Sequence, residues 1–239
     1  PQGGDGGFVE VSSPGALRFD ANVTTDAPAG APGRFLLDPT DVTICDLADV
    51  VCEPGTVPGI YTTEQIERLL DSQNVEIVTV GTGEVNDPPF DLDQNDEEGD
   101  ITVEGDLLWE SDTRLTLTAL DDIFLRSTIQ AGNGTLALDT GDDVSAEFAD
   151  VSVNRLEVTA NVFEIWDSDV TTDVTAIVAD RMELIEGSGD SSWTQLSGDL
   201  GTIEVTDFRA PPFSSFLRAR GGSGTEADPY LISDVYGLQ

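Results

Sequence analysis

Short runs of alternating apolar and polar residues recur along the chain, and each run is bounded by Gly, Asp, Asn or Ser. Alternating runs rich in Val, Ile, Leu, Thr and Phe predict β-strands. Residues 62–71 differ, because their apolar positions share one helical face and Thr62 with Gln65 fits a capping box. The pattern therefore predicts an all-β chain with one short helix near 62–71, which covers an edge of the core.

The apolar runs in the middle of the chain repeat with a period of about 21 residues, and three series share this period. The first series comprises residues 115–117, 136–138, 156–158 and 177–178. The second comprises residues 123–125, 144–146, 163–165 and 182–184. The third, which is weaker, comprises residues 128–129, 151–153 and 170–171.

Three short strands per repeat describe a triangular coil in which each strand pairs with its equivalents in the neighbouring coils. The sequence thus predicts a right-handed parallel β-helix, or β-solenoid, of roughly ten coils and about 50 Å in length, at ~4.8 Å per coil. Alternation directs one ladder of side chains into the core: Leu115, Leu117, Leu136, Leu138, Leu156 and Val158. An antiparallel sandwich is the alternative, and the single long period disfavours it.

Breaks in the period suggest how the chain is divided. We expect a β-helix over residues 1–210, with loops at 45–60 and 83–99. Residues 211–224, which end in a Gly-rich stretch, are interpreted as a linker, and residues 225–239 as the start of a following repeat module.

The charge balance narrows the range of partners. The 239 residues include 47 acidic and 10 basic residues and no His, for a formal net charge of -37. Such a charge repels phosphate backbones and anionic lipid, so we expect neither nucleic-acid binding nor membrane insertion. Every basic residue is Arg, and the Lys-free acidic balance favours adaptation to saline surroundings; a multi-site calcium-binding protein is the competing interpretation.

Few residues suggest a chemical site. A Ser-His-Asp or Cys-His arrangement is excluded without His, and no cofactor is expected. Paired carboxylates could still cleave polysaccharide, although close pairs arise by chance in so acidic a chain. Asp91, Asp93 and Asn95 match the first ligands of a calcium loop, but Asp96 replaces the sixth-position Gly and Thr102 the twelfth-position Glu. A solvated acidic loop is therefore favoured over a calcium site.

Two further residue types leave alternatives open. Cys45 and Cys52 could close a small disulfide loop in an oxidising compartment, or remain two buried thiols. Trp109, Trp166 and Trp193 could stack on sugars if they point outward, but core filling is the favoured interpretation.

Several segments resemble the filamentous haemagglutinin-like exoproteins of two-partner secretion systems, which are large adhesins of Gram-negative bacteria. The segments are 6–13 (GGFVEVSS), 35–44 (FLLDPTDVTI), 99–103 (GDITV), 115–119 (LTLTA) and 222–232 (GSGTEADPYLI). The region 62–79 is similar to the family's short helix and the strand after it. The insert with Cys45 and Cys52, the acidic stretch 91–100 and the absence of Lys depart from the family pattern.

This resemblance implies a secreted, extracellular protein at the cell surface, exported through an outer-membrane secretion partner and binding a cell-surface or glycan receptor. We therefore expect a segment of a large adhesin that acts as a rigid, non-catalytic stalk or fibre. One alternative is a β-helix that binds or cleaves polysaccharide. Another is a subunit of an extracellular filament that polymerises by self-association.

Overall fold

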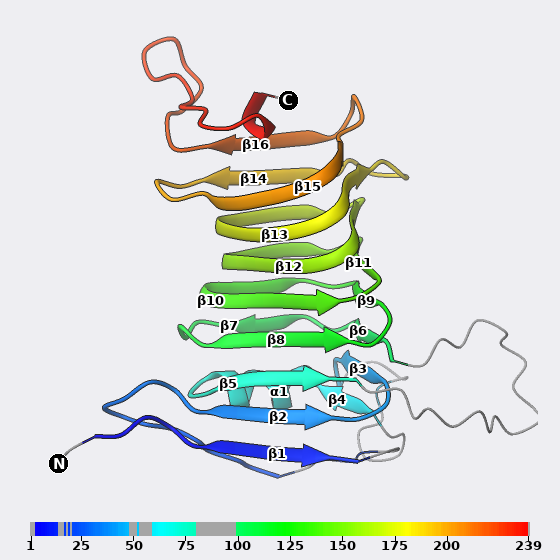
Figure 1. Ribbon diagram of the computed structural model, residues 1–239, viewed down its shortest axis with the longest axis vertical. Helices are drawn as coiled ribbons and strands as arrows, with labels where there is room; N and C mark the ends of the chain where they lie inside the picture. The colour runs from blue at the N-terminus through cyan, green and yellow to red at the C-terminus, as the bar shows by residue number, and fades with distance from the viewer. Residues whose placement is uncertain are drawn as a thin grey trace, which may run out of the picture.

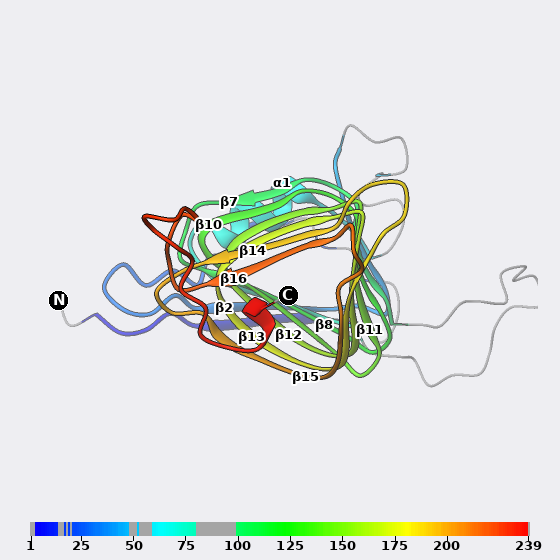
Figure 2. The ribbon, with the colours of Figure 1, turned by 90° about the horizontal axis from the view of Figure 1, so that it is seen from above.

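The chain forms a right-handed parallel β-helix of about eight turns, with about 22 residues between successive turns (Figure 1). Seen from the C-terminal end, the chain winds counter-clockwise as it rises toward the viewer, which is the right-handed sense (Figure 2). Eight coils at ~4.8 Å each give a rod of about 40 Å, which is shorter than the predicted length of about 50 Å. The structure is a computed structural model that describes residues 3–13, 17, 19, 21–47, 52, 59–79 and 99–238.

All pairings between the strands of the described residues are parallel, which rules out the antiparallel sandwich. Three faces surround the core (Figure 2). The first face stacks β1 (Phe8–Ser12), β2 (Arg34–Asp38), β5 (Asn74–Val78), β8 (Arg114–Ala119), and parts of β10 (Ile129–Thr140), β12 (Asp150–Trp166), β13 (Asp169–Ile185) and β15 (Gly201–Arg209).

The second face follows the first around each coil. It stacks β4 (Ile60–Thr62), β3 (Val42–Cys45), β6 (Ile101–Val103), β9 (Ile123–Leu125), β11 (Asp143–Glu147) and the last residues of β12, β13 and β15. The third face stacks β7 (Leu107–Trp109), the first residues of β10, β12 and β13, then β14 (Ser192–Leu196) and β16 (Ser215–Ala219). Because β12 and β13 pass through all three faces, they bind the faces into one unit.

The helix α1 (Thr63–Leu70) lies beside β7, at the N-terminal edge of the third face. Thr62 accepts a hydrogen bond from the backbone N–H of Gln65, and the Gln65 side chain accepts one from the Thr62 N–H, so the predicted capping box is present. Ile66, Leu69 and Leu70 are buried in the core. The helix therefore covers the core where the third face has no further strand among the described residues.

Side chains at equivalent positions in successive coils form columns inside the rod. Val75, Leu115, Leu136 and Leu156 lie in one column of the first face, because each pairs with the next. A parallel column contains Ile77, Leu117, Leu138, Val158 and Ile177. The predicted ladder residues from Leu115 to Val158 are all at most 2% exposed, so the core of the middle coils is an aliphatic stack.

The prediction for the next coil was wrong by two residues. Ile177 was aligned with Leu156, but it pairs with Val158, and Thr175 lies opposite Leu156. A shift of two positions keeps every side chain on the same side of a strand, so the apolar pattern could not reveal the shorter coil. Thr175 is tolerated inside because its hydroxyl donates to the Leu200 carbonyl at 2.8 Å.

The predicted end of the β-helix at residue 210 was also wrong. β16 lies within the supposed linker 211–224 and pairs with β14 over five residues, Ser215 to Ala219. Residues 225–238 fold back on the last coil, and they include the 3-10 turn η1 (Tyr236–Leu238). Pro211 and Pro212 interrupted the strand pattern at a bend between two faces, not at a domain boundary.

The two predicted loops are described in part. β3 ends at Cys45 and β4 begins at Ile60, which agrees with the predicted loop 45–60 at both ends. Of the second loop, 83–99, only Gly99 belongs to the described residues.

Candidate functional site

A row of aspartates runs along the corner between the first and second faces. Asp100, Asp122 and Asp143 each precede the first inward residue of a second-face strand, and pairing places those inward residues in register. Asp41 occupies the same place before β3. This aspartate row, Asp41, Asp100, Asp122 and Asp143, thus repeats at the spacing of neighbouring coils, ~4.8 Å.

The carboxylates of the row bind the backbone of the next coil. The Asp122 N–H donates to Oδ1 of Asp100 at 3.0 Å, and the Asp143 N–H donates to Oδ1 of Asp122 at 2.9 Å. The N–H of Gly99 donates to Oδ1 of Asp41 at 2.7 Å. Hydrogen bonds from N–H groups to carboxylates are charge-assisted, so the row reinforces the stacking of coils at this corner.

Like charges also accumulate at this corner. Carboxylate oxygens of Asp100, Asp121 and Asp122 lie within 4.8 Å of one another, as do those of Asp122, Asp142 and Asp143. Burial raises the pKa of Asp143, and the neighbouring charges of Asp122, Asp142 and Glu164 raise that pKa further. Carboxylate oxygens in such groups are the ligands that hard cations such as Ca²⁺ prefer. These residues are the described ones with the geometry to hold a cation.

The sequence-predicted calcium residues Asp91, Asp93 and Asn95 lie outside the described residues, so the structure does not relate them to the aspartate row. Sequence reasoning missed the row, although a signal was present. An Asp directly precedes the first apolar residue in Asp41-Val42, Asp100-Ile101, Asp122-Ile123 and Asp143-Val144.

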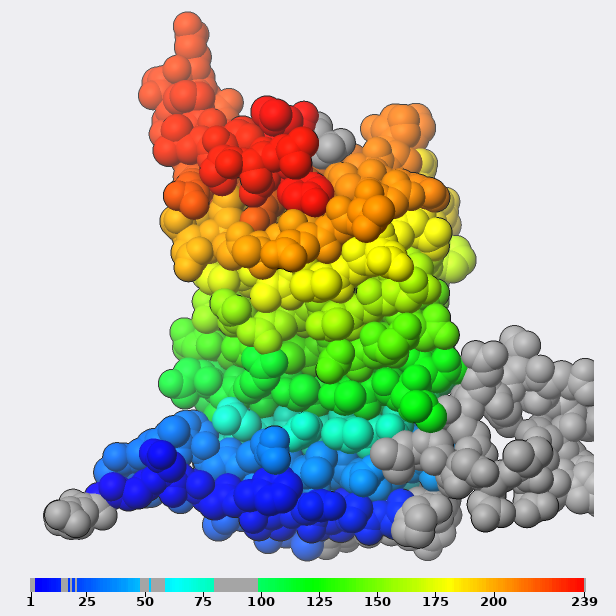
Figure 3. Space-filling model, viewed as in Figure 1, coloured from blue at the N-terminus to red at the C-terminus, as the bar shows by residue number. Residues whose placement is uncertain are grey.

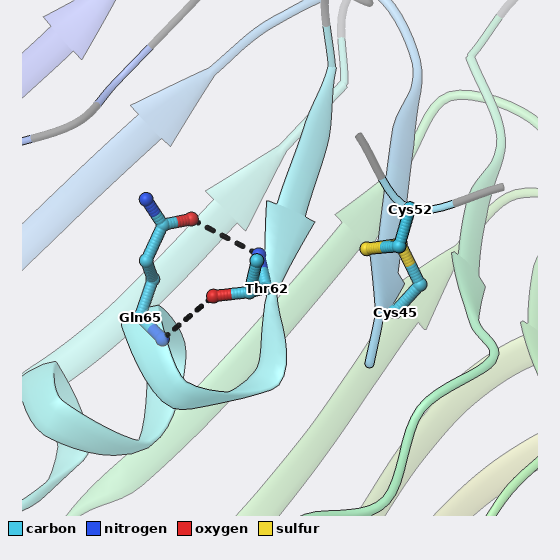
Figure 4. The surroundings of a disulfide bond; sticks show 4 residues. All are labelled: Cys45, Cys52, Thr62 and Gln65. Atoms are coloured by element: carbon cyan, nitrogen blue, oxygen red, sulfur yellow. Dashed lines mark hydrogen bonds between the residues drawn. A yellow bond between two sulfur atoms is a disulfide. The ribbon is translucent and has the colours of Figure 1, made fainter. Parts of the chain in front are cut away.

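Cys45 and Cys52 form a disulfide, with their Cα atoms 5.8 Å apart. Both residues are buried, and Cys45 pairs with Thr62 at the N-terminus of α1, so that the bridge lies on the opposite side of Thr62 from Gln65 in Figure 4. It closes the loop that leaves the second face after β3. A disulfide is typical of proteins outside the reducing cytosol.

The three tryptophans do not form one outward strip. Trp109 and Trp193 are buried, and Trp193 packs between Phe163 and Phe216 in an aromatic part of the core. Trp166 is half-exposed and contacts only one neighbouring aromatic ring among the described residues, that of Phe148 at 6.2 Å between centroids. A sugar-stacking surface built from all three is therefore excluded.

Ion pairs on the outer surface link one coil to another. Arg114 and Arg155 both bind the carboxylate of Glu157, at 2.6 and 2.5 Å. Arg114 reaches Glu157 across the intervening β10, because β8 pairs with β10 and β10 with β12. The hydrogen bond from Arg114, with help from Arg155, lowers the pKa of Glu157. Arg114 thus links two coils that are not direct neighbours.

Comparisons with known proteins give no relative: no family model, curated protein or solved structure matches this chain. Within the described residues, no helix is long and apolar enough to cross a membrane.

Proposed function

We propose that this chain is a segment of a large secreted surface adhesin and acts as a rigid, non-catalytic stalk for attachment to cells or matrix. The observation that carries the proposal is the continuous parallel register of the first face, from β1 to β15. A solenoid in which each coil pairs with its neighbours extends by addition of coils and holds its ends apart.

The net charge of the chain and its disulfide bond support this proposal. A net charge of -37 keeps an extended rod from associating laterally at low salt, and salt screens the internal repulsion. The disulfide between Cys45 and Cys52 suits an extracellular location. The resemblance of segments 6–13 and 35–44 to filamentous haemagglutinin-like exoproteins adds export through an outer-membrane partner and a cell-surface or glycan receptor.

The test uses the intact parent protein on cells of its natural source. An antibody raised against this chain should label the surface of intact cells, and electron microscopy should show the label along thin projections of constant width. Deletion of the chain's coding segment should shorten the projections and reduce attachment, whereas purified chain should not shorten polysaccharides during incubation. Label confined to permeabilised cells would contradict the proposal, and shortened polysaccharide would favour a cleaving β-helix instead.

A further inference from the structure

The segment 220–238 covers the C-terminal end of the β-helix without extending its sheet. Figure 2 shows η1 over the interior of the rod, and Figure 3 shows this segment standing above the last coil. Its backbone hydrogen bonds, where the structure describes them, stay within the segment; Arg220 N–H donates to Leu231 O at 2.8 Å, and Leu231 N–H to Gly221 O at 2.9 Å. The segment therefore adds no strand to the described sheet.

Two side-chain contacts attach this segment to the coil beneath it. Arg218 of β16, 2% exposed, donates from Nε to Oδ2 of Asp234 at 2.7 Å. The ring of Tyr236 contacts that of Phe208, with centroids 5.4 Å apart. The other guanidinium nitrogens of Arg218 donate within the β-helix, to Thr175, Gln195, Leu200 and Gly201. Arg218 thus keeps neutral hydrogen-bond partners within the β-helix when Asp234 moves away.

Most apolar side chains of the segment point away from the core. Leu231, Val235 and Leu238 are 60%, 65% and 74% exposed, and Tyr230 and Ile232 are also exposed. Hydrophobic stabilisation grows with the apolar area removed from water, so the segment gains little from its position.

The two ends of the first face match each other. Among the described strands, β15 pairs only with β13, and β1 only with β2, so each has one open edge, meaning an edge without a strand partner. On the open edge of β15, the Gly201 carbonyl accepts a hydrogen bond from Nη2 of Arg218 at 3.0 Å. Both strands run in the same direction, because all intervening pairings are parallel. The inward column that starts at Val9 ends at Gly201, and the one that starts at Val11 ends at Ile203.

A β1 strand placed on the open edge of β15 would continue both columns. In that register Glu10 would lie opposite Thr202 and Ser12 opposite Glu204, so no two carboxylates would face each other directly. Val9 and Val11, which are only partly buried, would gain cover. The end that the segment occupies is therefore complementary to the opposite end of the same molecule.

We propose that residues 220–238 are a displaceable cap, and that release of the cap lets β1 of a second copy pair with β15, so that the rods join end to end. Because each junction continues the rod along its own axis, uncapped molecules form open chains rather than closed rings. The inference concerns the ends of the rod and does not rest on an adhesive role.

The experiment compares variants of the chain, residues 1–239, by sedimentation velocity at about 1 M salt, where the Debye length falls to about 3 Å and repulsion between copies is screened. The unaltered chain should sediment as a monomer. Tyr236→Ser, and separately Asp234→Ala, should produce a ladder of concentration-dependent oligomers. Glu226→Gln, at an exposed position in the same segment, is the matched control and should remain monomeric.

A second substitution tests the partner surface. The C=O of Gly7 and the N–H of Ser13 bond to β2, so by strand alternation the N–H of Glu10 points away from β2. Glu10→Pro should thus block the open edge and leave the pairing of β1 with β2 intact. Added to Tyr236→Ser, it should reduce oligomers at least tenfold. Folded cap variants that stay monomeric, oligomers that persist with Glu10→Pro, or loss of the β-rich circular dichroism spectrum in both cap variants would each overturn the proposal.

Discussion

The backbone N–H of Asp143 donates a 2.9 Å hydrogen bond to the carboxylate of Asp122 in the preceding coil. The same pair brings two negative charges together. Burial of Asp143 raises the pKa of its carboxyl group, and the neighbouring charges of Asp122, Asp142 and Glu164 raise that pKa further. A raised pKa means that the folded state binds a proton more readily than the unfolded state, so ionised Asp143 opposes folding. The hydrogen bond from the Asp143 N–H stabilises this corner, whereas repulsion between the carboxylates destabilises it.

Asp143→Asn should therefore stabilise the protein at pH 7 and low salt by about 0.5–1 kcal/mol. Acidification through the raised pKa protonates Asp143 in the unaltered chain and removes the difference. Thermal unfolding at pH 7 and pH 4, in low and high salt, measures the effect. Asp142→Asn, at the exposed neighbouring position, should change stability less. A variant that is less stable than the unaltered chain at pH 7 would show that the carboxylate is needed at this corner.

Glu157 should behave in the opposite way. Its bonds to Arg114 and Arg155 lower its pKa, so the stability it contributes is present at neutral pH and lost as the pH falls through the lowered value. Glu157→Gln should cost about 1 kcal/mol at pH 7, because the pair is on the surface, and almost nothing near pH 2. Urea unfolding across this pH range checks the trend. Thr159→Ala, on the same strand and exposed, should show no such pH dependence.

Truncation of a single side chain in the aliphatic columns should lower the free energy of unfolding by a large amount. Leu136 is fully buried between Leu115 and Leu156, so Leu136→Ala should leave a cavity and cost about 2–5 kcal/mol. Thr116→Ala, which changes an outward position on the neighbouring strand, should cost much less. Equilibrium unfolding of both variants provides the comparison. Equal losses would mean that the two positions do not differ in burial as the register requires.

The disulfide has two testable consequences, one for labelling of the cysteines and one for the free energy of unfolding. Alkylation without reduction should label neither Cys45 nor Cys52, and reduction should expose both to the reagent, as mass spectrometry would record. Replacing both by Ser should cost about 2 kcal/mol, the value expected for closure of so short a loop. Labelling of the unreduced protein would instead indicate two free thiols.

The sequence contained enough to predict the architecture, because period and alternation together place Leu115, Leu136 and Leu156 in one column. It could not place Ile177, since a coil shortened by two residues preserves the alternation of inward and outward positions. It also missed β16, because the preceding prolines and following glycines gave the signal of a linker. Whether a strand adds a coil depends on its pairing partner, which lies far away in the sequence.

The candidate site was harder to predict than the fold. Each aspartate of the row is an ordinary polar residue before a strand when taken alone, and only the register shows that Asp100, Asp122 and Asp143 are neighbours. The same holds for Arg218, whose burial depends on Thr175, Gln195 and Asp234 meeting at one corner. Polar contacts of this kind join residues from different coils, so the pattern of neighbouring residues in the sequence does not predict them.

The hydrogen bonds between coils point along the long axis of the rod, and this direction determines how the molecule would respond to a pulling force. Tension applied between its two ends loads one row of bonds at a time, so coils would peel away in sequence rather than rupture together. Each coil of about 22 residues would release roughly 70 Å of extended chain. A rod that is stiff at rest would then lengthen stepwise under load and absorb mechanical work before its attachment is lost.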